Sequence, residues 1–249
     1  MDVFPLNLVL AVATAAATIF LGFLPTRNIN SRFFGQEAIK AALLWFFIAM
    51  ASPSAISHYH IFIALLCFGA WWQFRRERAL NGKMWLSIAS GLGISIGVML
   101  LLAVTPRAYP ADLPELNRML LLASIYLGGG VIGLAYVTYI LIQGAATRSG
   151  VTSELVQRYA ELLLMLAIAR AAILWIAIYL QHGFDLLLKG ALPVTTGLLL
   201  VLAGLLLPLF AFAAWQALGK RATTQAGMIL AGLGLMGFLA ESLARMLVL

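Results

Sequence analysis

The chain has 249 residues, of which 63% are hydrophobic and 10% are charged, and its 16 Lys and Arg outnumber 9 Asp and Glu. Soluble domains are about 45–50% apolar and about 25% charged, so this composition excludes a soluble enzyme, a nucleic-acid-binding domain and a disordered chain. The mean hydropathy of +1.00 leaves no room for a soluble domain of average size. Cys67 is the only cysteine, so this chain cannot form an internal disulfide or hold an iron–sulfur cluster by itself.

The apolar segments predict an all-α, polytopic membrane protein. A helix needs roughly 20 apolar residues to cross about 30 Å of hydrocarbon. Eight segments fit, at residues 4–24, 37–55, 58–74, 84–104, 117–142, 158–181, 192–217 and 225–248. The second segment ends at Ser52-Pro53-Ser54, where we expect a turn because proline disfavours helix at the residue before it. The loops are short and no linker divides the chain, which indicates one eight-helix transmembrane domain over residues 1–249.

The basic residues orient this bundle. With the N-terminus outside, the inner loops and adjoining helix ends hold eleven of them: Arg27, Arg32, Lys40, Arg75, Arg76, Arg78, Lys83, Arg148, Arg158, Lys220 and Arg221. The outer side holds three, namely Arg107, Arg118 and Lys189. This bias follows the positive-inside rule. It predicts that both termini lie on the outer (periplasmic) side of a cell inner (cytoplasmic) membrane.

Small residues and one proline indicate how the helices pack. Three pairs have the spacing that permits close helix contact in lipid: Gly93 and Gly97, Gly129 and Gly133, and Gly227 and Ala231. Pro208 lies inside the seventh predicted helix, where it removes one backbone hydrogen bond and is expected to kink the helix.

Charged residues within the predicted spans require a partner. A charge at mid-span costs roughly 2.5–3.5 kcal/mol on insertion scales. Arg170 lies about 18 Å into the sixth predicted helix and Glu241 about 24 Å into the eighth, at 1.5 Å per residue. Both helices run outward, so we expect a buried Arg170–Glu241 pair. Arg245 lies four residues after Glu241, on the same helix face. The pair either sets helix register or lines a polar pocket.

The three histidines, His58, His60 and His182, all lie on the outer side of this topology. They are either solvated at the interface or handle protons, for which imidazole is suited. His58 and His60 point to different helix faces, so a b-type haem would need His182 with one of them. No Glu-x-x-His or His-Glu-x-x-His motif predicts a metal site. The chain therefore has a polar outer cluster without cofactor ligands of its own. A quinol suits such a cluster, because its hydroxyl protons need nearby acceptors.

The C-terminal quarter of the chain has a distinctive order of segments: Leu198–Trp215, the basic loop Gly219-Lys220-Arg221, and Ile229–Arg245, which ends in Glu241-x-x-x-Arg245. In this order it resembles the membrane anchor subunit of DMSO reductase-type molybdenum enzymes. The glycine-rich stretch Tyr126–Leu134 is also similar to the fifth helix of that family. The resemblance covers about a third of the chain.

The resemblance implies a division of labour. The chain would anchor an iron–sulfur subunit and a molybdopterin catalytic subunit, and would oxidise menaquinol or ubiquinol near the outer face. His58 or His60 would accept one quinol proton, and Glu241, held by Arg170 and Arg245, would accept the other. Neither haem nor metal is expected in this chain, with a b-type haem as the minor alternative. The alternatives are a small-solute or ion transporter and a purely structural subunit of a membrane complex.

Overall fold

The prediction of an all-α fold is confirmed by the computed structural model, which describes residues 4–26, 29–52, 54–108, 115–147, 150–188 and 194–248. Side chains are described for residues 7–26, 29–52, 56–98, 119–120, 123–124, 126–147, 150–180, 194 and 196–244. The predictions that concern the side chains of Arg27, Arg107, Arg118, Arg148, His182, Lys189 and Arg245 lie outside the described residues.

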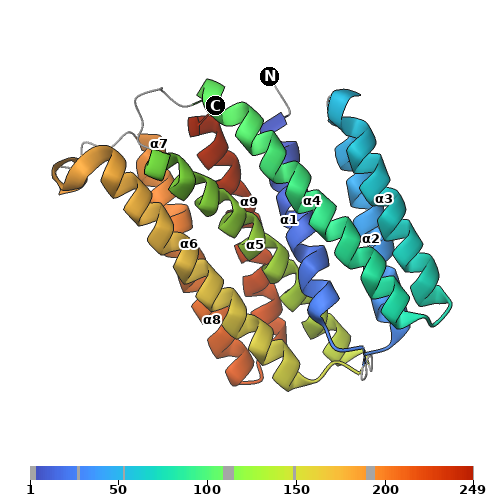
Figure 1. Ribbon diagram of the computed structural model, residues 1–249. Helices are drawn as coiled ribbons and strands as arrows, with labels where there is room; N and C mark the ends of the chain where they lie inside the picture. The colour runs from blue at the N-terminus through green and yellow to red at the C-terminus, as the bar shows by residue number, and fades with distance from the viewer. Residues whose placement is uncertain are drawn as a thin grey trace.

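The described chain folds into helical rods, and each rod runs opposite to the one before it in the chain (Figure 1). Their bounds are α1 Phe4–Phe23, α2 Ser31–Met50, α3 Ser54–Arg75, α4 Ala79–Ala108, α5 Glu115–Ala146, α6 Ser153–Leu188, α7 Val194–Leu199, the π-helical segment η1 Leu200–Leu206, α8 Leu207–Gly219 and α9 Thr223–Val248. α7, η1 and α8 follow one another without a break and form one rod. Figure 1 shows that the chain begins and ends at the same end of the molecule.

The second helix is displaced from its predicted position. It begins at Ser31 rather than at residue 37 and ends at Met50 rather than at residue 55. Asn30 caps its start, because the Asn30 side chain accepts a hydrogen bond from the Arg32 backbone N–H. The first turns of α2 contain polar residues, so the hydropathy of the sequence did not indicate that the helix begins at Ser31. As a result, Glu37 lies inside the helix and not at its end.

The helices form two four-helix units. In the first unit α1, α2, α3 and α4 pack in a ring, and in the second unit α5, α6, the α7–η1–α8 rod and α9 do the same. The units meet mainly through α1 and α5, which run in the same direction (Figure 1). Each unit is an up-and-down bundle, the arrangement that short loops between successive helices favour.

Glycines allow α1 and α5 to pack closely, as the spacing of Gly129 and Gly133 predicts. A Cβ atom added at Gly133 would lie 2.7 Å from both the Ala13 carbonyl oxygen and the Ala17 nitrogen. These are backbone atoms, which cannot move aside cheaply. By contrast, a Cβ at Gly227 would meet Tyr139 at an ordinary 3.8 Å, so close contact does not require glycine there.

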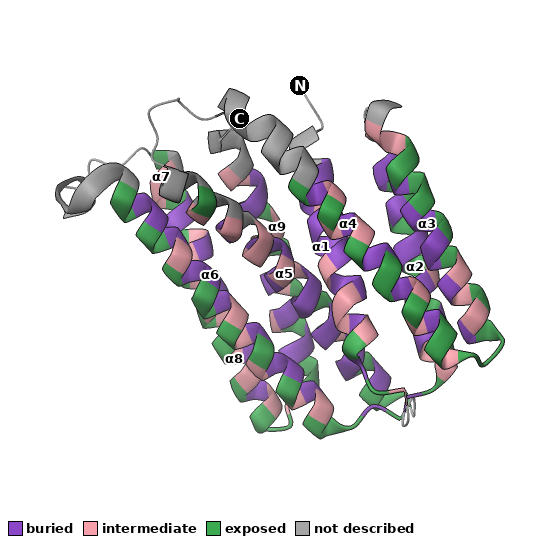
Figure 2. Cartoon of the chain, in the orientation of Figure 1, coloured by how far each residue is buried: buried purple, intermediate pink, exposed green. Residues whose placement is uncertain are grey.

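The surface is apolar, as expected for a protein in lipid. Exposed side chains such as Phe47, Leu65 and Met165 are more than 60% accessible, whereas Arg170 and Glu241 are 1% accessible. Figure 2 shows exposed residues along the outer faces of both units. Helices long and apolar enough to cross a membrane occur in the described chain at Ser31–Met50, Tyr126–Ala146, Ser153–Leu180, Thr196–Gly219 and Thr223–Ala244, with a shorter apolar helix at Asn7–Phe23. The chain is therefore a multi-pass helical membrane protein.

The rod that contains Pro208 has π-helical geometry over η1, directly before α8, whose first turn holds this proline, and the kink expected at Pro208 stays a prediction. In this segment the Leu207 N–H bonds to the Leu202 carbonyl, five residues earlier. The next carbonyl in this pattern, that of Ala203, would pair with the N–H of residue 208, which proline lacks. Pro208 therefore cannot donate to the Ala203 carbonyl, which lies in the middle of the rod.

Candidate functional site: a buried ion pair and a polar-ended pocket

Arg170 and Glu241 form an ion pair inside the second unit, as the sequence predicts. Arg170 lies on α6 and Glu241 on α9, and Arg170 Nη2 donates a hydrogen bond to Glu241 Oε1. Arg170 is among the largest fully buried side chains of the described chain. Removing one partner of a buried pair leaves an uncompensated charge, so each side chain depends on the other for its position.

The π-helical segment η1 supplies a further acceptor for Arg170. Arg170 Nη1 lies 3.4 Å from the Ala203 carbonyl oxygen and donates to it. This is the carbonyl to which Pro208, five residues later, has no N–H to donate. The arginine therefore donates both to the Glu241 carboxylate and to a main-chain carbonyl of η1. The π-helical segment and the ion pair thus belong to one site.

A glycine on α5 makes room for the pair. A Cβ atom added at Gly128 would lie 2.7 Å from Arg170 Nε and would also overlap the Glu241 carboxylate. The glycine-rich stretch of α5 therefore serves two purposes. Gly129 and Gly133 allow contact with α1, and Gly128 accommodates the ion pair on the other side of the helix.

Each side chain of the pair has one open polar atom, that is, an atom without a partner among the described residues. Among the described residues, Arg170 Nε and Glu241 Oε2 have no hydrogen-bond partner. Buried polar atoms are almost always paired, and an exception calls for an explanation such as a water or a functional role. Glu241 Oε2 can accept a proton or a hydrogen bond, and Arg170 Nε can donate a hydrogen bond beside it.

The predicted histidines lie apart from the pair. His58 is exposed, whereas His60 is 3% exposed. His60 Nδ1 lies 3.1 Å from Ser52 Oγ, and the His60 ring stacks on Trp45 at a centroid distance of 5.5 Å. α3, which carries both histidines, packs mainly against α2 and α4 of the first unit. The structure therefore brings Arg170 and Glu241 together but does not bring His58 or His60 beside them.

A second polar cluster lies at the junction of the two units. Glu37 on α2 is 5% exposed and accepts two hydrogen bonds, each of 2.6 Å. Lys40 Nζ donates to Glu37 Oε1, and the Tyr136 hydroxyl on α5 donates to Glu37 Oε2. The sequence interpretation missed this cluster, because it placed Glu37 at the end of the second predicted span. The three-residue spacing of Glu37 and Lys40 was the available signal, since it puts both on one helix face.

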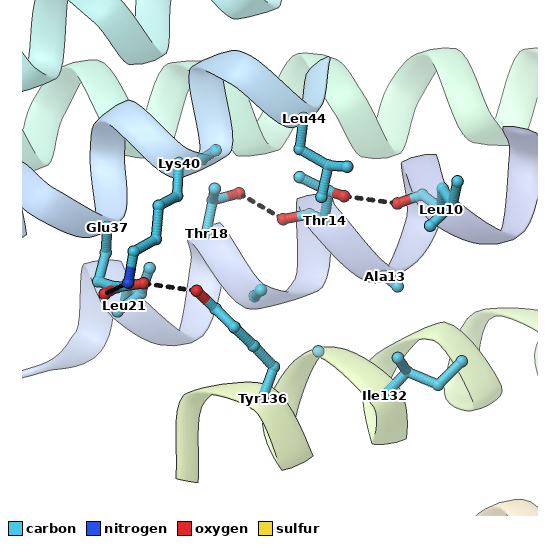
Figure 3. Close-up of a pocket in the computed structure, with 13 residues that line it drawn as sticks. Leu10, Ala13, Thr14, Thr18, Leu21, Glu37, Lys40, Leu44, Ile132 and Tyr136 are labelled. Carbon is cyan, nitrogen blue, oxygen red and sulfur yellow. Dashed lines mark hydrogen bonds and ion pairs between the residues drawn. The ribbon is translucent and has the colours of Figure 1, made fainter. Parts of the chain in front are cut away.

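This cluster closes one end of a pocket between α1, α2 and α5 (Figure 3). The pocket has a volume of about 240 Å³. Glu37, Lys40 and Tyr136 lie near Leu21 at one end, and Leu10, Leu44 and Ile132 lie toward the other end. The pocket is therefore polar at one end and apolar along its length.

The fold and the two polar sites define a multi-pass helical membrane protein with ionisable side chains buried between its helices. No protein-family model, curated protein or solved structure matches the chain. Among the side chains that the structure describes, no group of three or more His, Cys, Asp or Glu is arranged to hold a metal ion.

Proposed function

We propose that the chain is the membrane anchor subunit of a multi-subunit oxidoreductase, and that it binds and oxidises quinol near the outer membrane face. The observation that carries this proposal is the buried Arg170–Glu241 pair with its open atoms. A quinol hydroxyl needs a proton acceptor, and Glu241 Oε2 is a carboxylate oxygen that accepts no hydrogen bond from the described residues. The apolar surroundings suit the isoprenoid tail of menaquinol or ubiquinol.

The proposed topology has eight membrane spans with both termini outside. α3 has 22 residues and α4 has 30, which at 1.5 Å per residue is about 33 Å or more, long enough to cross the hydrocarbon. The end of the molecule opposite the termini carries, among the described residues, Arg32, Arg75, Arg76, Arg78, Lys83, Arg158, Lys220 and Arg221. The positive-inside rule assigns this end to the cytoplasmic side of a cell inner membrane.

The chemistry divides between this chain and its partners. Oxidation of one quinol releases two protons and two electrons. Glu241 would take a hydroxyl proton while Arg170 holds the carboxylate in place. The electrons would pass to a cluster in the iron–sulfur partner subunit, which in turn binds the molybdopterin catalytic subunit. His58 and His60 lie near the start of α3, at the end of the molecule where both termini lie (Figure 1). One of these two histidines would accept the second proton after its release at that end.

A small-solute or ion transporter is the second candidate. It is favoured by the π-helical irregularity of the α7–η1–α8 rod beside a buried charge, because transporters place irregular helices and ionisable groups at mid-membrane. The two units also repeat the same alternation of helix direction. Ion or solute flux through the isolated chain in liposomes, without partner subunits, would favour this candidate over the anchor.

Isolation of the native complex tests the proposed function. We expect partner subunits that contain molybdenum and iron, detected by elemental analysis. A protein that purifies alone, with neither metal, would contradict the anchor role.

Substitution tests the site within such a complex. We expect Glu241→Gln to slow quinol oxidation about 100-fold or more, the range lost with a general base, and His60→Ala to slow it as well, while the complex still assembles. Glu154→Gln is the control, because Glu154 is 75% exposed and pairs with Arg158 at the surface. Unchanged quinol oxidation in both Glu241→Gln and His60→Ala would refute the site.

A further inference from the structure

The pocket between α1, α2 and α5 lies outside the site proposed for quinol oxidation. It lies at the junction of the two units, whereas Arg170 and Glu241 lie within the second. Its walls are formed largely by apolar side chains and by Ala13, Ala17 and Gly133, where α1 and α5 approach closely. The small residues leave space beside the helices that larger side chains would fill.

The polar end of the pocket is electrically balanced. The Glu37 carboxylate and the Lys40 ammonium form an ion pair, and the Tyr136 hydroxyl holds the second carboxylate oxygen. An ammonium has three donors and each carboxylate oxygen has two acceptor positions. The cluster can therefore both donate to and accept from a ligand, but it carries no net charge to attract an anionic headgroup.

The threonine hydroxyls along α1 already donate to main-chain carbonyls and are not free to donate to a ligand. Thr14 Oγ1 donates to the Leu10 carbonyl at 2.6 Å, and Thr18 Oγ1 donates to the Ala15 carbonyl at 2.8 Å. With these protons used inside the helix, the length of the pocket presents mainly carbon to a ligand. From Leu10 to Leu21 the helix rises about 16 Å, the length of an extended chain of about a dozen carbons.

We propose that this pocket binds a single-chain amphiphile with an uncharged head that carries hydroxyl or carbonyl groups. The head lies at Glu37, Lys40 and Tyr136, and the chain lies along α1 toward Leu10 and Leu44. A carbonyl in the head accepts from Lys40, which is 57% exposed at the rim, and a hydroxyl donates to Glu37. A quinone and a monoacylglycerol share this chemistry. The proposal concerns binding alone and is independent of the function proposed for Arg170 and Glu241.

Photolabelling of the purified full chain in phosphatidylcholine nanodiscs tests the proposal. The probe is a decyl-chain quinone that carries a diazirine in its chain, and the labelled peptides are identified by mass spectrometry. We expect labelling on α1, α2 and α5, and competition by unlabelled decylquinone and by monodecanoylglycerol. The stronger of the two competitors identifies the natural head. Competition by decyl phosphate alone, or labelling confined to other helices, would overturn the proposal.

Variants connect the labelling to the pocket. Ala41 lines the pocket, so Ala41→Leu fills it and is expected to reduce labelling at least tenfold. Tyr136→Phe and Glu37→Gln each remove part of the polar end and are expected to reduce it about fivefold, the effect of one lost hydrogen bond. Tyr136→Phe is nearly isosteric and keeps the test valid if Ala41→Leu does not fold.

Matched controls come from residues away from the pocket. Tyr139→Phe alters a tyrosine one turn further along α5, whose hydroxyl accepts from Gln143, and Glu161→Gln alters a carboxylate on α6 that bonds Trp215. Both are expected to label like the unaltered chain. Equal labelling of Tyr136→Phe, Glu37→Gln and their controls would overturn the proposal. Labelling needs no partner subunit and no electron transfer, so its failure is distinct from failure of the proposed function.

Discussion

The Arg170–Glu241 pair shows how a membrane protein holds charge at the scale of single residues. The two side chains neutralise each other, Gly128 leaves space for them, and the Ala203 carbonyl accepts a second hydrogen bond from the arginine. Each of these contributions comes from a different helix. Removal of one partner from such a buried pair is strongly destabilising. Replacement of both partners by apolar residues costs little, because the desolvation of the two charges offsets much of their attraction.

A double-mutant cycle tests this account of the pair. Arg170→Met and Glu241→Met are each expected to destabilise the chain by about 3–5 kcal/mol, because each leaves one charge buried without its partner. The double variant is expected to recover most of this loss. The measurement is unfolding of the purified chain in mixed detergent micelles. If the double variant is less stable than both single variants, the pair is not the source of the loss.

At the scale of helices, the close contact of α1 and α5 joins the two units. Without a hydrophobic effect between helices in lipid, close packing has to supply much of the association energy. Gly133 permits this packing, because backbone atoms of α1 occupy the space that a side chain would need. The same approach of α1 and α5 forms one side of the pocket.

Gly133→Ala is expected to destabilise the chain by about 1–3 kcal/mol, the usual cost of overpacking. Gly91→Ala is the matched control. A Cβ at Gly91, on α4, meets nothing within 4 Å, so this change is expected to be neutral or to stabilise the helix by up to about 1 kcal/mol. The measurement is thermal unfolding in detergent. Equal effects of the two substitutions would contradict the proposed close packing.

At the scale of the whole molecule, the two ends differ in charge. The end opposite the termini collects basic residues from several turns between helices, and this asymmetry is the basis of the proposed orientation. Both units have this charge difference. Each unit begins at the end where the termini lie and has four rods, so the turns after its first and third rods lie at the opposite, basic end.

Cysteine accessibility tests the orientation. Cys67 is buried, and Cys67→Ala provides a background without thiols. Ala51→Cys, beside the turn after α2, is expected to react with a membrane-impermeant maleimide in intact spheroplasts. Leu80→Cys is expected to react only after permeabilisation, because Leu80 is 79% exposed at the opposite end. The reverse pattern would show that the termini lie inside.

Some of the candidate site could be predicted from the sequence, and some could not. Arg170 and Glu241 were predictable partners because a charge at mid-span needs compensation and both lie at similar depth. Glu37 was missed because the capped start of α2 at Ser31 extends the helix beyond the apolar run, so hydropathy placed this carboxylate at the end of the span and not inside the helix. Residues on helices that are distant in sequence, such as Gly128 and Ala203, carry no sign in the sequence that they meet the ion pair.

Membrane insertion, the helical class and the charge bias could be read from the chain alone, because each is a sum over the residues of one segment or loop. Insertion depends on the transfer free energy of about 20 neighbouring residues. The division into two units, the separation of His60 from Glu241 and the pocket beside Glu37 depend instead on which helices touch. Which helices touch is decided by packing between segments far apart in the chain. One glycine, one proline or one capped turn in such a segment changes which side chains meet.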